Sequence, residues 1–301
     1  MAHPRFKSLL DATTGAITVA LIRAVKWFDR KRTANFAGAV VRKLGPLFKE
    51  HRLGRENLRA AFPEKSDAEI ERILTGVWDN LGRMAVEFAH LDEFSLQGFG
   101  TPTADVVTYA PETLAHYHDI VNSAKSTITF AAHLANWELS GLVAKLVGFK
   151  SAVLYRRPNN KAVSDAVIKL RAPLMGELVP TTLDAPVKLA RLLQSGVHVG
   201  MVADQHYSRG VEVTFFGRRC LANPLVALLA RQTGCAIHGI RLVRLPDGNS
   251  FWGELTEPIA TVRDADGRID IQGTTQAIMT MIERWVREHP EQWLWLHRRW
   301  R

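Results

Sequence analysis

The chain has 301 residues, of which 47% are hydrophobic and 23% are charged. This length can bury one large core, and the near-neutral mean hydropathy of -0.07 excludes a protein made of many membrane spans. Its 39 Lys and Arg residues outnumber its 30 Asp and Glu residues, and the formal net charge is +9. Such a surplus favours an anionic partner, which could be nucleic acid, an anionic membrane, a phosphorylated lipid or an acidic carrier protein. The spacing of Cys220 and Cys235 fits neither a zinc site nor a disulfide framework, so we expect reduced thiols.

Residues 1–95 have the pattern of a helical region. Residues 12–22 are uncharged, and Arg23 and Lys26 then interrupt the apolar run. A spanning helix needs roughly 20 apolar residues, and no small-residue cleavage site for a signal peptide follows. We therefore predict a membrane anchor at 13–28 that lies in or is tilted into the interface, with a spanning helix or an amphipathic helix docked on the domain as the alternatives.

The clearest helix of this region is predicted to begin at Ser66. Glu69 follows three residues later, which is the spacing of a capping box. Apolar side chains then recur at helical spacing from Ile70 to Phe88. Such a stripe packs into a core and carries no chemistry.

From residue 126 onward, short β-rich runs alternate with helical segments. Residues 92–125 form the predicted connector before them. This alternation predicts an α/β domain at 96–301 with a mostly parallel sheet flanked by helices, behind the helical N-terminal region. The expected strands are 126–133, 150–156, 198–204, 235–244 and 250–258, and the expected helices are 136–148, 159–176, 186–196, 221–234 and 272–289.

Two candidate catalytic residues stand at the end of the first expected strand. His133 ends that strand, and Glu138 falls in the first turn of the next helix. Because reactive groups gather at the carboxyl ends of parallel strands, we expect Glu138 to fold back onto the imidazole. A histidine paired with a carboxylate is a general base suited to neutral pH. The alternative is a histidine that ends the strand and a glutamate favoured by the helix dipole.

Several short motifs in order along the chain are similar to those of one family. They are RENLRAAFPEKS (55–66), HLANWE (133–138), YRRPNN (155–160), ADQ (203–205), FFG (215–217) and PEQWLWLHRRW (290–300). This set resembles the late acyltransferases of lipid A biosynthesis, of the lauroyl/myristoyl type, within the lysophospholipid-acyltransferase superfamily. The resemblance covers roughly residues 10–300.

The resemblance implies an O-acyltransferase that needs no metal or other cofactor. Its donor would be an acyl carrier protein thioester, and its acceptor a hydroxyl of a Kdo-bearing lipid A precursor at the cytoplasmic face of the inner membrane. The family's catalytic histidine and acidic residue fall on His133 and Glu138 of the HX4E motif. Its functional arginine falls on Arg171, and its aspartate falls on Asp204.

The arginines near the motifs suit an acceptor that carries phosphates and carboxylates. Arg156, Arg157 and Arg171 could each bind such groups through two hydrogen bonds. The sequence YRRP replaces the family's commoner YRP, so either Arg156 or Arg157 could take the position of the family arginine.

Two aromatic motifs allow both a functional and a structural interpretation. Phe215, Phe216 and Gly217 could line an acyl groove or end an apolar strand. The tryptophans and arginines of 290–300 could face lipid headgroups, stack on nucleic acid or pack in the core.

Three other functions are compatible with parts of the sequence. A glycerolipid acyltransferase shares the histidine-acid spacing, but neither PEKS (63–66) nor PETL (111–114) matches its downstream phosphate motif. A metal hydrolase could use His133, Glu138, Asp204 and His206 as ligands, although there is no H-E-x-x-H. A nucleic-acid-binding protein would suit the charge, yet the positive residues are spread along the chain, so we expect no nucleic acid partner.

Overall fold

The computed structural model of the chain describes residues 4–96, 106–123 and 125–300, with side chains from residue 12 onward except that of Val106. Part of the predicted connector at 92–125 therefore lies outside the described residues. What is described of it includes short elements of regular structure. Its strand β2 runs over Val106–Tyr109 and its helix α5 over Pro111–Asn122.

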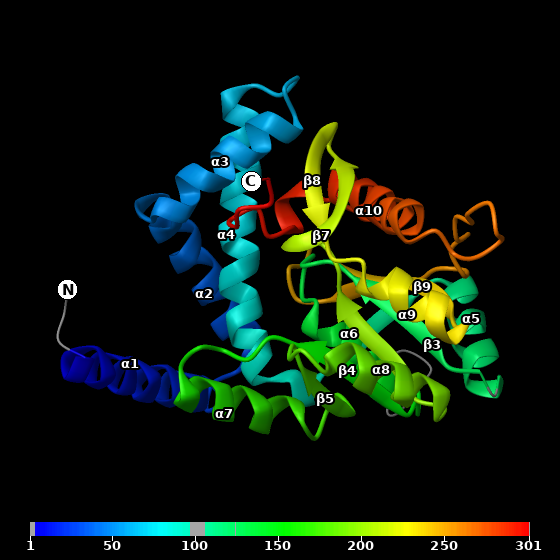
Figure 1. Cartoon of the computed structure of the whole chain (residues 1–301). Coiled ribbons are helices and arrows are strands. Elements are labelled where there is room, and N and C mark those ends of the chain that lie inside the picture. Colours follow the sequence, from blue (N-terminus) through cyan, green and yellow to red (C-terminus); the bar gives the residue numbers. More distant parts are fainter. Residues whose placement is uncertain (1–3, 97–105, 124, 301) are drawn as a thin grey trace.

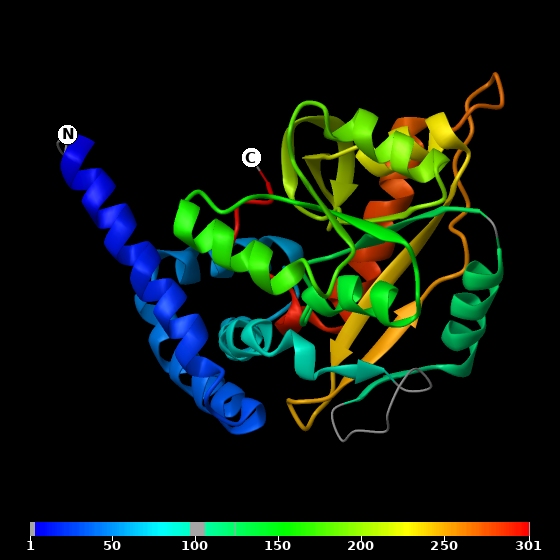
Figure 2. The same ribbon diagram turned by 90° about the horizontal axis from the view of Figure 1, so that it is seen from below.

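Helices make up the N-terminal region and stand to one side of the α/β part (Figure 1). The predicted capping box is confirmed, because the Ser66 side chain accepts from the Glu69 amide and the Glu69 carboxylate accepts from the Ser66 amide. Figures 1 and 2 show the first helix side by side with α7 (Lys161–Arg171). The elements of this region are α1 (Pro4–Val25), α2 (Arg30–Leu44), η1 (Gly45–Leu47), α3 (Lys49–Ala61), α4 (Asp67–Ala89) and η2 (Leu91–Glu93).

No helix within the described residues is both long and apolar enough to cross a bilayer. The segment 13–28 belongs mostly to α1, and the chain turns after Val25.

The predicted α/β fold with a mostly parallel sheet is confirmed. In the described part of the chain, eight strands form one sheet in the order β1-β2-β10-β9-β3-β6-β4-β5. Strands β9, β3, β6, β4 and β5 run parallel to one another, and β10 is antiparallel to β9. The bounds are β1 (Ser95–Leu96), β3 (Thr127–Ala131), β4 (Ser151–Tyr155), β5 (Glu177–Pro180), β6 (His198–Val202), β9 (Ala236–Arg244) and β10 (Phe251–Leu255).

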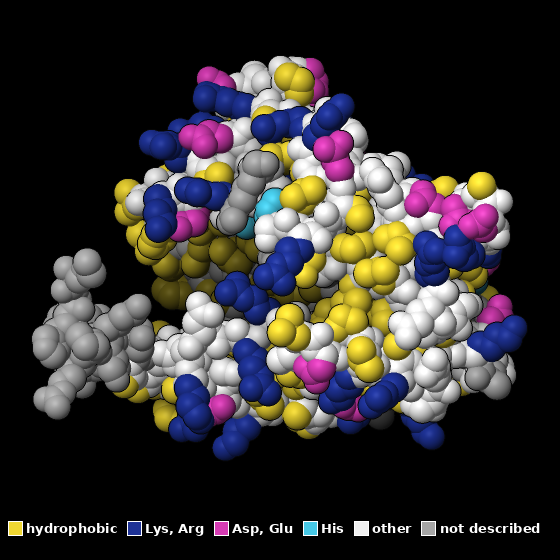
Figure 3. Space-filling model, viewed as in Figure 1, with side chains coloured by type: hydrophobic (Ala, Val, Ile, Leu, Met, Phe, Trp, Pro, Cys, Tyr) yellow, Lys and Arg dark blue, Asp and Glu magenta, His cyan; other side chains and the backbone are white. Residues whose placement is uncertain are grey.

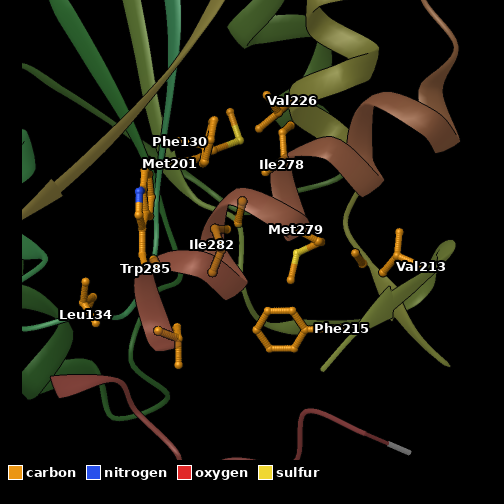
Figure 4. Close-up of a cluster of buried hydrophobic side chains, with 14 of the residues drawn as sticks. Phe130, Leu134, Met201, Val213, Phe215, Val226, Ile278, Met279, Ile282 and Trp285 are labelled. Atoms are coloured by element: carbon orange, nitrogen blue, oxygen red, sulfur yellow. The ribbon is translucent and has the colours of Figure 1, made fainter. Parts of the chain in front are cut away.

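Apolar packing covers both faces of the sheet, as the nearly continuous burial of β3 requires. On one face, Ala131 and Ile240 pack with residues of α5 and α6 (Glu138–Leu146). On the other face, Phe130 stacks on Trp285 at 5.7 Å between ring centroids, within the cluster drawn in Figure 4. That second face is covered by α8 (Ala185–Gln194), α9 (Leu225–Thr233) and α10 (Ile271–Glu288), and the short η3 (Pro290–Gln292) follows α10.

A separate β-hairpin corrects the expected helix at 221–234. Strand β7 (His206–Phe215) pairs with β8 (Arg218–Ala222), so the helix begins only at Leu225. Backbone with positive φ at Phe216 and Gly217 (52° and 68°) makes the tight turn between the two strands. A turn of this handedness matches the twist of paired strands. The sequence FFG therefore forms a hairpin turn.

Candidate active site

A short loop between β3 and α6 presents His133. The neighbouring C-terminal segment holds this loop in place, since the Leu294 amide donates to the His133 carbonyl at 3.1 Å and the Ala135 amide donates to the Gln292 carbonyl at 2.8 Å. Ala135 has φ of 47°, a conformation that L-residues other than Asn and Asp rarely adopt. The loop is therefore tied at several points to a segment more than 150 residues away in the sequence.

Asp204 is the carboxylate that binds the imidazole. The β3–β6 pairing places the end of each strand at the same edge, so that Asp204 lies beside His133. The Oδ1 atom of Asp204 is 2.7 Å from Nδ1 of His133, and its Oδ2 accepts from the His133 main-chain amide at 2.8 Å. The indole Nε1 of Trp293 donates to the same Oδ2 at 2.7 Å. The Asp204 side chain is fully buried, whereas 14% of the His133 side chain is exposed.

The hydrogen bonds to Asp204 fix the protonation of the pair. Two of its three partners can only donate, which suits an ionised carboxylate. Burial alone would raise the pKa of Asp204, but the charge and hydrogen bond of His133 lower it below its usual value. Burial alone would lower the pKa of His133, but Asp204, with a smaller contribution from Glu138, raises it above its usual value. In the neutral imidazole Nδ1 carries the proton, and Nε2 is left as the basic atom.

The prediction that Glu138 contacts the imidazole of His133 is wrong. The carboxylate of Glu138 instead binds Arg171 of α7 through two hydrogen bonds, one of them from Nε to Oε2 at 2.8 Å. Both side chains are largely buried, at 6% and 17% exposed. Asp204 reaches Nδ1 directly from the neighbouring strand, and Glu138 acts on His133 only through its charge.

A cavity of about 1320 Å³ opens beside the imidazole. His133, Glu138 and Arg171 line it together with apolar residues of β3, β4, β6 and α6. From there it extends along the sheet to Phe149, Tyr117 and Ile120, which lie near the amino-terminal end of β3. One end of the cavity therefore holds His133, and the deep end is lined by aromatic and apolar side chains together with Thr127 and His198.

The two arginines of YRRP differ in position. Both are exposed at the end of β4, but only Arg156 lines the cavity. The Nε of Arg157 donates to the Tyr155 hydroxyl at 3.4 Å. The geometry thus favours Arg156 for contact with a molecule in the cavity.

Most aromatic side chains of the two motifs are buried, which favours the structural interpretation of each motif. Phe215 is fully buried and lies beside Met279 of α10 (Figure 4), and Phe216 is 4% exposed. Neither lines the large cavity. Trp293 and Trp295 are also fully buried, so their rings pack in the interior and do not face headgroups or bases.

Three neighbours of His133 were not singled out as site residues from the sequence. Trp293 holds Asp204, the Trp137 ring meets the imidazole edge to face at 4.9 Å, and Nε2 of Gln205 is 3.4 Å from Nε2 of His133. Each lies in a motif that the sequence analysis named, HLANWE, ADQ or PEQWLWLHRRW. The motifs could therefore have indicated these three residues, but their contacts with His133 and Asp204 depend on the tertiary fold.

Within the ranges that the structure describes, no group of three or more His, Cys, Asp or Glu side chains is arranged to hold a metal ion. His133 and Asp204, two of the ligands considered for a metal hydrolase, bind each other.

The fold and the site define an α/β protein with a partly exposed histidine, bound to a buried aspartate, at a large and mostly apolar cavity. The chain belongs to the family of bacterial lipid A biosynthesis acyltransferases, whose model matches residues 3–301. The predicted resemblance is thereby confirmed for the whole chain. Among curated proteins, no match to the chain was found.

Proposed function

We propose that the protein transfers a fatty acyl group from an acyl carrier protein thioester to a hydroxyl of a Kdo-bearing lipid A precursor. Membership of the family supports acyl transfer in lipid A biosynthesis. The His133–Asp204 pair beside the large cavity is the observation that carries the proposal. It supplies a base next to a space that can hold an acyl chain.

The proposed reaction begins at Nε2 of His133. This atom takes the proton of the acceptor hydroxyl, and the oxygen attacks the thioester carbonyl carbon. Collapse of the tetrahedral intermediate breaks the carbon–sulfur bond, and the thiolate leaves with the proton from His133. The negative charge of Asp204 stabilises the imidazolium between the two steps, as in other histidine–aspartate pairs.

Glu138 and Arg171 take a different role in this proposal. The carboxylate fixes the guanidinium at the wall of the cavity that the imidazole also lines. From there Arg171 can bind a phosphate or carboxylate of the acceptor, or the developing oxyanion. Glu138 is then a positioning residue for Arg171, and the exposed Arg156 adds a second cation at the opening.

The deep part of the cavity suits the acyl chain of the donor. Strand β3 forms one wall, and from Thr127 to Ala131 it extends roughly 13 Å at about 3.3 Å per residue. An extended polypeptide residue contains three backbone bonds, so an extended chain advances about 1.2 Å per bond. The wall therefore matches the length of roughly eleven bonds of an extended acyl chain. Gly141 and Ala144 of α6, whose side chains are small, line the same space.

The N-terminal helices offer a surface for the membrane. Large apolar side chains are exposed there, among them Trp27 (83%), Phe36 (71%) and Leu47 (80%). Lys and Arg residues, such as Arg23 and Lys43, lie close to them in the sequence. Apolar side chains with flanking cations bind anionic membranes. We therefore propose that the protein acts at the cytoplasmic face of the inner membrane, bound through these helices.

An assay of purified protein tests the proposal. We expect transfer from an acyl carrier protein thioester to a Kdo-bearing lipid A precursor, detected by mass spectrometry of the product, and its loss in His133→Ala. A lysophosphatidate acceptor serves as the comparison. Acylation of lysophosphatidate in place of the precursor would contradict the proposal and support the glycerolipid alternative.

A further inference from the structure

A buried polar cluster lies behind the loop that carries His133. Glu87 of α4 is fully buried, and Arg244 at the end of β9 is 8% exposed. The two form a double hydrogen-bonded ion pair, with Nη2 of Arg244 2.9 Å from Oε2 of Glu87. Neither residue lines the large cavity. The pair therefore has no contact with a substrate in that cavity.

Hydrogen bonds lead from this ion pair to the loop on two routes. The Nδ2 atom of Asn136, fully buried, donates to Glu87 at 2.9 Å, while its Oδ1 accepts from the Glu138 main-chain amide at 3.2 Å. On the second route, Nε of Arg244 donates to Asn80 at 2.9 Å, whose Nδ2 donates to the carbonyl of Ala135 at 3.2 Å. The ion pair thus holds two adjacent residues of the loop between His133 and Glu138.

This loop needs such support because of its backbone. Ala135 adopts φ of 47°, and an L-residue in the left-handed region costs roughly 1–2 kcal/mol. Strained conformations of this kind persist only where the surroundings fix them. A buried ion pair is costly in itself, because two charges must leave water. Two apolar side chains of equal volume could fill the same space without this cost, but they could not form the hydrogen bonds that hold the loop.

We propose that the Glu87–Arg244 pair is a positioning device, which through Asn136 sets the geometry of the loop from His133 to Glu138. The kinetic test of this inference rests on the proposed function, because it measures acyl transfer, whereas the structural part of the inference does not. Neither residue touches substrate, and both act through the loop.

Charge balance within the cluster supplies a specific test. Glu87→Gln leaves the buried Arg244 without a compensating charge, and Asn136→Asp puts a second carboxylate beside Glu87. The double variant Glu87→Gln/Asn136→Asp returns the cluster to neutrality and keeps a hydrogen bond between positions 87 and 136, with donor and acceptor exchanged. The carboxylate introduced at position 136 can still accept from the amide of Glu138.

We expect each single variant to lose about 100-fold in kcat, the effect of a misplacement of about 1 Å, with KM changed far less. The double variant should recover at least 10-fold of that loss. Glu254→Gln is the control, because it removes one charge from the partly buried Arg241–Glu254 pair (2.6 Å) between β9 and β10, which does not touch the loop, while Arg241 keeps its pair with Glu288. The control should leave kcat near that of the parent protein.

A second readout does not depend on acyl transfer. Carbethoxylation of His133 by diethyl pyrocarbonate, followed by peptide mass spectrometry, reports the reactivity of Nε2 in the folded protein. The single variants should change this rate several-fold, and the double variant should restore it. If folded Glu87→Gln kept the kcat and the His133 reactivity of the parent protein, the proposal would be overturned. The same holds if the control lost as much kcat as the single variants, or if the double variant recovered none of the loss. Absence of acyl transfer in the parent protein, with His133 reactivity still dependent on Glu87, would count against the proposed function alone.

Discussion

The hydrogen bonds around Asp204 define the chemistry at the scale of single residues. Its carboxylate accepts from the His133 ring, the His133 amide and Trp293. Because these donors hold the carboxylate in its ionised form, the imidazole proton stays on Nδ1 and Nε2 remains basic. In the proposed reaction, a substrate hydroxyl in the cavity would meet a base whose orientation is already set.

The raised pKa of His133 predicts the pH dependence of the reaction. The base works in its neutral form, so the rate rises with pH as the imidazole loses its proton. Since Asp204 and Glu138 raise the pKa, the midpoint of this rise in kcat/KM should lie above the ordinary imidazole value of about 6.5. A midpoint below that value in the parent protein would contradict the assignment of His133 as the base.

Asp204→Asn should affect both the rate and this midpoint. We expect kcat to fall by about 10²–10⁴-fold, because the neutral amide no longer stabilises the imidazolium. The midpoint should move to lower pH, since burial still lowers the pKa of His133 while the opposing charge is gone. The pH profile of the residual activity checks both effects. Glu138→Gln should shift the midpoint less, because Glu138 contributes less to the raised pKa.

At the scale of elements, the sequence predicted what depends on local pattern. The capping box at Ser66 marked the N-cap of α4. The ends of β3 and β6 indicated His133 and Asp204 as site residues because parallel strands bring their carboxyl ends together.

Features that depend on tertiary packing could not be predicted in the same way. Two carboxylates, Glu138 and Asp204, lie near His133, and only the register of β3 with β6 and the position of α7 decide which one binds Nδ1. The β7–β8 hairpin was also missed, because its turn places Phe216 at a positive φ that Gly, Asn or Asp would normally signal. The sequence around Trp293 suits both a core position and a membrane interface, and only its complete burial in the fold distinguishes the two.

The walls of the cavity lead to a prediction for strand β6. A Cβ atom at Gly200 would meet only Oγ1 of Thr129 within 4 Å, at 3.2 Å, so a larger side chain has room to project into the space beyond. Gly200→Val should therefore fold, because valine suits a strand, and should shorten the acyl site. We expect kcat/KM for long-chain donors to fall at least 10-fold relative to short-chain donors, measured with a series of acyl carrier protein thioesters.

Phe149→Leu is the variant that should act in the opposite direction. The Phe149 ring stacks on His198 at 4.6 Å at the deep end of the cavity, and a smaller side chain lengthens the space. The preference should then move toward longer chains. An unchanged preference in both variants would show that the acyl chain binds elsewhere.

At the scale of the whole molecule, the exposed apolar side chains and the net charge support the proposed binding to a membrane. Apolar side chains gather between Lys and Arg on the face shown in Figure 3, and others are exposed on the N-terminal helices. A protein with a net charge of +9 is attracted to an anionic surface. In the proposed arrangement, the net charge attracts the protein to the membrane and the exposed apolar side chains of the N-terminal helices anchor it.

Vesicle binding tests this arrangement. Phe36→Ser and Leu47→Ser together should weaken sedimentation with anionic phospholipid vesicles at least 10-fold, since a buried apolar side chain contributes roughly 1.5–3 kcal/mol. Val121→Ser, which alters an exposed apolar residue on α5, is the control and should bind as the parent protein does. Added salt should weaken binding of all variants through screening. Equal binding by the double variant and the control would rule out the N-terminal surface as the anchor.

The mass of lipid A in living cells tests the central claim most directly. Cells that carry His133→Ala as their only copy should make lipid A lighter by one fatty acyl group, whereas cells with His116→Ala, a histidine outside the large cavity, should make lipid A of full mass. A lipid A of full mass in the His133→Ala cells would contradict the account.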